Sequence, residues 1–126
     1  MARSQRRSNR KPSGGRYHYT RTKRLRELAG FPVNTKLEKE RKVKTTRIRG
    51  GRTKHSLLTA SNVNVCDNKG KATKVGILNV VGNPANPHLV RRNIITKGAI
   101  VETKLGKVRI TSRPGQEAAL NGVLVK

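Results

Sequence analysis

The side chains that could perform acid–base, nucleophilic or metal chemistry are few in this sequence and are not grouped. The three histidines, His18, His55 and His88, are separated by 37 and 33 residues, and the single cysteine is Cys66. No CxxC, HxxxH or HExxH pattern, which would present several ligands to one metal ion, occurs. We therefore expect no metal site and no cofactor. His18 is predicted to stack or to contact phosphate, His55 to be a hydrogen-bonded strand residue, and His88 to cap a loop.

The six acidic residues do not suggest an enzyme either. Glu38 and Glu40 lie among basic residues, where they compensate local charge. No pair of carboxylates stands in an apolar stretch that would raise a pKa for general acid catalysis. The serines and threonines lack a suitable base, and neither a G-x-S-x-G turn nor a P-loop occurs. We expect the protein not to be an enzyme.

Basic residues are the dominant chemical feature. The 126 residues include 30 Lys and Arg against six Asp and Glu, a formal charge of +24. Such self-repulsion implies a polyanionic partner that neutralises the excess. Residues 1–56 hold nineteen of the cations and three of the acids, and residues 1–26 hold ten cations and no acid. The charge is therefore concentrated toward the N-terminus.

The kind of nucleic acid follows from what the sequence lacks. It has no convincing recognition helix for the DNA major groove, and its strands have no aromatic platform for single strands. Tyr17 and Tyr19, which could stack on bases, lie in the basic N-terminal segment. Recognition is expected to use Arg and Lys against the phosphates and shape of a folded RNA, not DNA.

The expected location is the cytoplasm, without a membrane partner. There is no run of 18 apolar residues, and the basic N-terminus is not followed by the apolar segment of a signal peptide. Cys66 cannot form a disulfide within the chain, which suits a reducing compartment.

Two parts are predicted: a basic RNA-penetrating arm, residues 1–30, and a β-barrel-like body, residues 31–126. The arm has nothing to bury, so we expect it to be disordered when free and to become ordered inside RNA. A short helix with a glycine cap is predicted within residues 21–30. Phe31 is expected to fill the edge of the core, and residues 33–39 to form a connector.

From Lys42 onward the apolar pattern has a period of two, which indicates strands. The first strand, residues 42–49, is expected to be half-buried with one basic face. In the strand of residues 73–81, Val75 and Ile77 are expected on one face and Val80 on the other. A rigid Asn-Pro loop follows at residues 83–88. We predict a mainly β fold, a small antiparallel β-barrel or closed sandwich with an aliphatic core, a basic extended N-terminal arm and at most one short helix. The predicted strands span residues 42–49, 54–59, 63–66, 73–81, 93–96, 99–104, 107–112 and 122–125.

Four motifs in order along the chain carry a family resemblance: RKPSGGR (10–16), RIRGG (47–51), NPANPH (83–88) and VRRNIITKGAI (90–100). Together they resemble the S-eight-e family of small-ribosomal-subunit proteins of archaea and eukaryotes. The segment TSRPGQ (111–116) resembles its short archaeal form. Each motif alone is weak, but four in register are specific.

The resemblance implies a structural constituent of the small ribosomal subunit, with an N-terminal extension threaded into RNA. The expected partners are small-subunit ribosomal RNA and neighbouring ribosomal proteins, and no homo-oligomer is expected. Ser56 and Thr59 stand where the family more often has Arg, so that end of the strand is not expected to contact RNA. Two alternatives remain: a ribosome-assembly factor of the same family that binds precursor ribosomal RNA, and an RNA-modifying enzyme.

The arm is expected to supply more of the binding energy than the rigid loop, while Arg91 and Arg92, after that loop, set the orientation. The predicted RNA-binding residues are Arg3, Arg6, Arg7, Arg10, Lys11, Arg16, Tyr17, Arg21, Lys23, Arg24, Arg26, Arg47, Arg49, Arg52, His88, Arg91, Arg92, Lys97 and Arg113.

Overall fold

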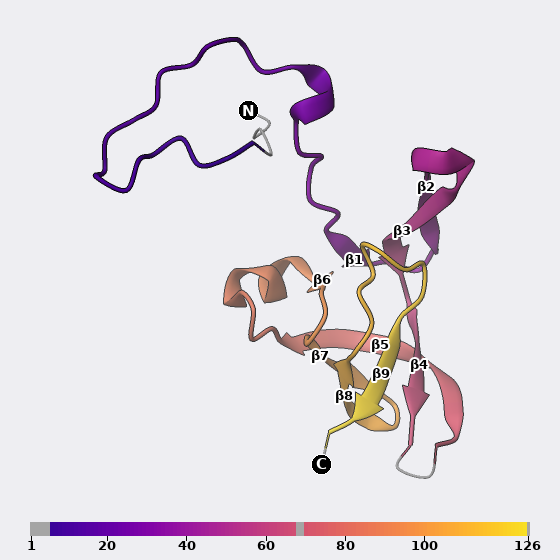
Figure 1. Ribbon diagram of the computed structural model, residues 1–126. Coiled ribbons are helices and arrows are strands. Elements are labelled where there is room, and N and C mark those ends of the chain that lie inside the picture. The colour runs from indigo at the N-terminus through magenta and orange to yellow at the C-terminus, as the bar shows by residue number, and fades with distance from the viewer. Residues whose placement is uncertain (1–5, 68–69, 126) are drawn as a thin grey trace. The chain divides into compact units, whose positions relative to one another are not determined.

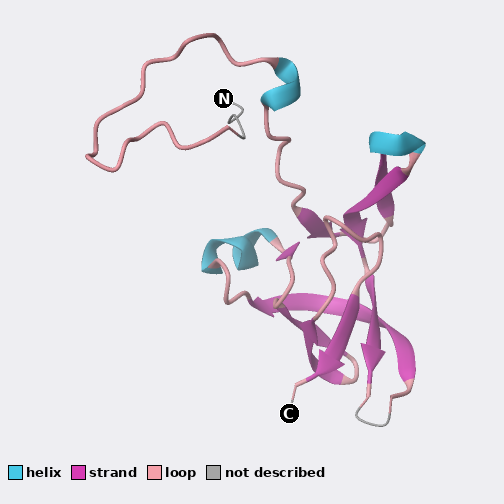
Figure 2. Cartoon of the chain, in the orientation of Figure 1, coloured by secondary structure: helices cyan, strands magenta, loops and turns pink. Residues whose placement is uncertain are grey.

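The computed structural model describes residues 6–67 and 70–125. The chain divides into two compact units, Met1–Pro32 and Val33–Lys126, which we call the N-terminal unit and the barrel unit. Strands dominate, and the helical segments are short (Figure 2). No helix among the described residues is long and apolar enough to cross a membrane.

The barrel unit contains a closed five-stranded barrel with the order β4-β5-β7-β8-β9 (Figure 1). Four neighbouring pairs are antiparallel, and the ring closes through a parallel pairing of β4 with β9. This confirms the predicted fold class, with one parallel seam that the period-two pattern does not reveal. The five strands are β4 (Asn62–Cys66), β5 (Ala72–Gly82), β7 (Ile100–Thr103), β8 (Gly106–Ile110) and β9 (Asn121–Leu124).

A second sheet has the order β2-β3-β1-β6. Its strand β1 lies within residues 33–39, so the prediction of a connector there was wrong. The reason is local: β1 has three residues, too few for a pattern, and it pairs in parallel with β3. The buried Thr35 holds it by donating a hydrogen bond from its hydroxyl to Leu57 O at 2.6 Å. The strands are β1 (Thr35–Leu37), β2 (Lys42–Arg47), β3 (Thr53–Ala60) and β6 (Ile94–Ile95).

One aliphatic core joins the barrel to the second sheet. Barrel residues such as Val65, Val101 and Val108 are fully buried, and Leu57 of β3 and Ile95 of β6 belong to the same cluster. None of the residues of that cluster comes from the N-terminal unit. The barrel unit is therefore stabilised by the burial of aliphatic side chains that all belong to residues 33–126.

The predicted faces of β5 required a correction. Val80 was expected on the opposite face from Ile77, yet both side chains are buried. The register with β7 shifts between Ile77 and Asn79, which marks a β-bulge or similar irregularity. An extra residue at a bulge moves every later side chain to the other face.

The three helical segments are 3₁₀ turns: η1 (Leu25–Glu27), η2 (Arg49–Gly51) and η3 (Pro87–Arg92). The helix predicted within residues 21–30 is therefore reduced to one turn, as expected for a short segment without packing. Phe31 was predicted to fill the core edge, but its side chain is 87% exposed. It lies in the N-terminal unit, outside the barrel unit's core.

Candidate nucleic-acid interface

The N-terminal unit contains a small hairpin formed by the motif RKPSGGR. Arg10 and Arg16 are bridged antiparallel, and the Lys11 N–H donates to Gly15 O at 2.8 Å. The Gly14 N–H closes the turn on Lys11 O at 3.0 Å, and Gly14 has a φ of +85°. A glycine in the left-handed region after a turn is a common hairpin closure. The amino-acid composition did not indicate this hairpin, because the hydrogen bonds that close its turn are made by backbone groups, which every residue type carries.

Tyr17 follows the hairpin and is surrounded by cations. The Arg7 guanidinium lies 4.2 Å from the ring centroid, and the Lys11 ammonium lies 5.6 Å from it. The backbone N–H of Tyr17 donates to Asn9 O at 2.9 Å, so the backbone at Tyr17 is tied to the segment that precedes the hairpin. These contacts are within the range of cation–π attraction. They hold positive charge beside an aromatic face before any partner arrives.

Arg21 and Glu27 form an ion pair within the N-terminal unit. The Arg21 guanidinium donates from Nη1 to Glu27 Oε2 at 3.1 Å and from Nη2 to the other carboxylate oxygen. This side-chain hydrogen bond lowers the pKa of the Glu27 carboxyl and raises the pKa of Arg21. Bidentate pairs of this kind fix geometry as well as charge. Glu27 therefore ties the chain around η1 to the segment that follows Tyr17.

The β2–β3 hairpin projects from the barrel unit (Figure 1). At its base, Val43 pairs with Leu57 and packs against the core. Beyond that pair, β2 is exposed on both faces, so the prediction of a half-buried strand held only for Val43. Thr45 and His55 lie opposite each other, with 3.0 Å between Thr45 Oγ1 and His55 Nδ1. His55 is therefore a hydrogen-bonded strand residue, as predicted.

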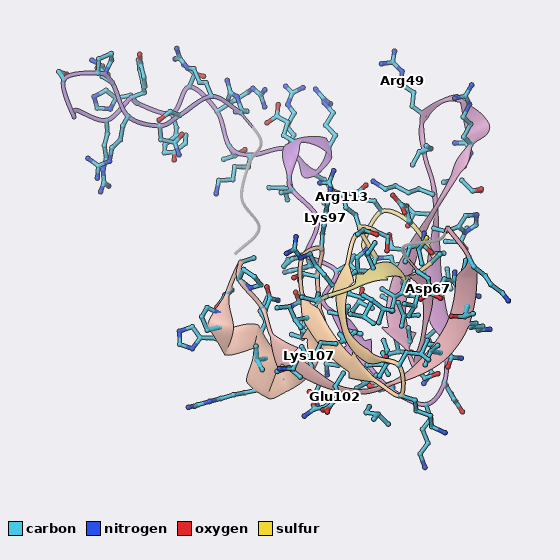
Figure 3. All side chains as sticks on the ribbon, turned by 90° about the horizontal axis from the view of Figure 1, so that it is seen from below. Arg49, Asp67, Lys97, Glu102, Lys107 and Arg113 are labelled. Atoms are coloured by element: carbon cyan, nitrogen blue, oxygen red, sulfur yellow. The ribbon has the colours of Figure 1, made fainter. Side chains whose placement is uncertain are left out.

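Three arginines occupy the tip of this hairpin: Arg47, Arg49 and Arg52. The Ile48 N–H donates to Arg52 O at 2.8 Å, which closes the tip. Gly50 and Gly51 have φ values of +79° and +74°, a conformation that favours glycine. Figure 3 shows the Arg49 side chain extending away from the tip. The turn thus spreads guanidinium groups at the end of a projecting element.

Two further lysines of the same hairpin, Lys44 and Lys54, are not among the predicted RNA-binding residues. Lys44 is exposed and Lys54 half-buried, and they pair with Ser56 and Thr46 respectively. Opposite residues of a strand pair share a face, so both lysines lie on one face of the hairpin. The alternation of cations over residues 42–49 was a signal that could have pointed to Lys44, whereas Lys54 lies outside that run.

The Asn-Pro loop is fixed by its asparagines. Asn83 is buried, and its side chain donates to Thr96 Oγ1 at 2.8 Å while accepting from the Ala85 N–H at 3.1 Å. Asn86 accepts from the His88 N–H at 3.0 Å. The capping side chain is therefore that of Asn86 and not of His88, because a short side-chain oxygen reaches the amide two residues on.

The loop leads into η3, which carries Arg91 and Arg92 in its last turn. Asn93 ends the segment in the left-handed region with a φ of +51°, and its N–H donates to Val90 O at 2.9 Å. Both arginines are exposed. The sequence predicted a stiff loop before the basic pair but not the helical turns that present it.

The predicted residues therefore fall into separate groups. Those of residues 6–26 lie in the N-terminal unit, and those of the barrel unit lie at the hairpin tip, on η3, or singly at Lys97 and Arg113. Most are exposed, while Tyr17 and Arg21 are half-buried. Arg3 lies outside the described residues. Within residues 6–67 and 70–125, no cluster of three or more His, Cys, Asp or Glu could hold a metal ion.

Comparison with known proteins identifies the family. Residues 4–125 match the family model described as ribosomal protein S8e. The small ribosomal subunit protein eS8 of Methanobrevibacter smithii is 50% identical over 126 residues, which cover 99% of this chain and 100% of the relative. The proteins of the same name from Methanocorpusculum labreanum and Methanococcus aeolicus are 49% and 46% identical, over 94% of this chain and 95% and 93% of their own lengths. The chain belongs to the ribosomal protein S8e family.

Proposed function

We infer that this protein is a structural constituent of the small ribosomal subunit, where it binds folded ribosomal RNA. The observation that carries this conclusion is the match of nearly the whole chain to relatives named as small ribosomal subunit proteins. The protein works in the cytoplasmic ribosome, and its role is not catalytic. Its high positive charge has a physical purpose in that setting, because RNA phosphates neutralise it.

Three elements are proposed to contact the RNA. The N-terminal unit contributes the hairpin around Gly14 and the cations that flank it. The barrel unit contributes the β2–β3 tip and η3, which are separate elements of that unit (Figure 1). Exposed arginines on backbone turns of fixed geometry suit bidentate phosphate contacts.

The way these elements are attached suggests different roles for them in RNA binding. The hydrogen bonds of Asn83 and Asn86 fix the loop before η3 on the barrel unit. Arg91 and Arg92 are therefore proposed to set the orientation of the protein on RNA. The N-terminal unit, with ten Lys and Arg and one acid, is proposed to supply more of the binding energy. Phosphate contacts position a protein, and their number sets the salt-dependent part of the affinity.

The partners proposed are small-subunit ribosomal RNA and neighbouring ribosomal proteins. DNA, a membrane and a second copy of the chain are not part of the proposal. The alternative of an assembly factor that binds precursor RNA is not favoured, because the relatives are named as subunit proteins. One copy per mature, translating subunit in salt-washed ribosomes supports the inference, and its absence from such subunits contradicts it.

The direct test is deletion of residues 2–20, which removes six cations and leaves the barrel unit's core intact. The truncated protein is expected to stay folded and to bind small-subunit ribosomal RNA at least roughly tenfold more weakly at about 150 mM salt. A full-length variant with the same six cations replaced by Gln serves as the control for chain length. Equal affinity of the truncated and intact proteins would contradict the proposed role of the N-terminal unit.

A further inference from the structure

The N-terminal unit encloses a cavity of about 320 Å³. Residues 6–9 line one part of it, and residues 17–21 with Lys23 line the rest. Its volume falls at the lower end of the range for small-molecule sites. Tyr17 and Tyr19 also line an adjoining hollow of about 270 Å³ on the hairpin side. Open space therefore lies next to both tyrosines.

The cavity is built by the chain itself. The bond from the Tyr17 N–H to Asn9 O holds the two lining segments together at the hairpin end. The Arg21 side chain, also in the lining, is held by its bidentate pair with Glu27. These bonds are all made within the chain, so the protein's own residues hold the walls of the cavity in place around a ligand.

The chemistry of the lining is specific. Both tyrosines of the chain are here, together with four of its Lys and Arg. Simple phosphate binding requires cations but no aromatic rings, whereas a nucleotide offers a flat base to stack and a phosphate to neutralise. Tyr19 is 66% exposed, and Tyr17 carries the Arg7 guanidinium at 4.2 Å from its centroid. Rings and guanidinium planes are the surfaces on which unpaired bases stack.

We propose that this cavity binds one unstacked nucleotide of the RNA, with its base against the tyrosine–arginine surface and its phosphate among the surrounding cations. The inference rests on the proposed function and deepens it. A protein that recognised only the phosphates and shape of the RNA would not contact its bases. This site, by contrast, requires an unpaired base at one point of contact. It also gives the tyrosines a role that the cations alone do not explain.

The sequence offers an unusually direct probe. The chain has two tyrosines and no tryptophan, so the tyrosine fluorescence of the unmodified full-length protein reports on this cavity. The protein is titrated with an oligoadenylate of about five nucleotides and with an abasic ribose-phosphate strand carrying the same number of phosphates. The oligoadenylate is expected to quench the fluorescence and to bind roughly 5- to 100-fold more tightly than the abasic strand. Equal affinities without quenching overturn the proposal.

Substitutions then separate the base contact from charge. Tyr17→Leu and Tyr19→Leu are expected to weaken binding of the oligoadenylate and to leave the abasic strand unaffected, while Tyr17→Phe, which keeps the ring, retains most of the affinity. Phe31→Leu is the matched control, because Phe31 is exposed and outside the cavity lining. If both leucine variants lose affinity for both strands alike, or for neither, the nucleotide site is contradicted. Salt-dependent binding of the abasic strand would still support the phosphate contacts of the proposed function, so the two failures are distinguishable.

Discussion

Gly122 is a position at which the barrel has no room for a side chain. A Cβ atom there would lie 2.5 Å from Val108 Cγ1 and 2.9 Å from Arg109 O, both on the neighbouring strand β8. The carbonyl cannot retreat without loosening the β8–β9 pairing, so the contact cannot be relieved by rotating a flexible side chain. Such close approaches are a common reason for glycine within a strand.

We therefore expect Gly122→Ala to lower the free energy of unfolding by about 1–3 kcal/mol, as overpacking in a dense core does. Urea unfolding of the full-length protein measures the change. Gly82→Ala in β5 is the control, because a Cβ there meets nothing within 4 Å. Its effect is expected to stay within about 0.5 kcal/mol. Equal stability of the two variants would show that β8 and β9 can separate freely at this point.

The Arg21–Glu27 pair gives the N-terminal unit a dependence on pH. Its hydrogen bond lowers the pKa of the Glu27 carboxyl below the ordinary value. A lowered carboxyl pKa means that the pair stabilises the local structure above the ordinary pKa of glutamate, and that this contribution is lost as the pH falls through the lowered pKa. Carbon NMR of the carboxyl should show the lowered titration, and Arg21→Gln should return it toward the ordinary value. An unchanged titration in that variant would mean that the pair does not persist in solution.

At the scale of elements, the sequence predicted best those strands in which every second side chain is buried. β4 shows this pattern, with Val63 and Val65 buried and Asn62 and Asn64 exposed. The sequence could not predict β1, whose position depends on a parallel pairing with β3 and a buried hydroxyl. Nor could it reveal the register shift in β5, which depends on the partner strand β7. These features arise from tertiary pairing, which leaves no local pattern.

The candidate site shows the same limit. The cations were identifiable from composition, and the turn at Gly50 and Gly51 from its motif. The hairpin between Arg10 and Arg16 and the cation–π contacts of Tyr17 were not, because they depend on backbone bonds and side-chain placement. Ser56 and Thr59, by contrast, have a clear structural reason. Both are buried, and their hydroxyls donate to the carbonyl oxygens of Gly115 and Glu40 respectively.

The β2–β3 tip is expected to act on RNA affinity without acting on stability. Replacing Arg47, Arg49 and Arg52 with Gln removes three exposed cations that lie outside the core. Each lost phosphate contact should reduce the slope of log affinity against log salt by about 0.7–0.9. Filter binding to small-subunit ribosomal RNA at several salt concentrations measures the slope.

The control for the tip carries the same change of charge elsewhere on the barrel unit. It replaces Lys71, Lys104 and Lys107, which are exposed beside other turns, with Gln. The unfolding free energies of both variants should stay within about 0.5 kcal/mol of the parent protein. An equal loss of affinity in the two variants would show that total charge matters and that the tip does not.

At the scale of the whole molecule, net charge opposes folding when RNA is absent. The formal charge is +24, and the ion pairs among the described residues include Arg21–Glu27 and Lys42–Glu40. The second is largely exposed, with 3.5 Å between Lys42 Nζ and Glu40 Oε2. Exposed pairs of this kind contribute little. Added salt is therefore expected to screen strong repulsion between like charges while weakening few attractive ion pairs.

We expect the midpoint of thermal unfolding of the RNA-free protein to rise as KCl increases from about 20 to about 300 mM, because the Debye length falls from roughly 20 Å to below 10 Å. Residues 33–126 alone, which keep the core, should show the same cooperative transition and a smaller rise, since that segment carries twenty cations and five acids. Differential scanning calorimetry on both proteins provides the measurement. The same screening weakens RNA binding, so the salt that stabilises the free protein should weaken its complex. A midpoint that falls with KCl would mean that attractive pairs, and not repulsion, dominate the folded state.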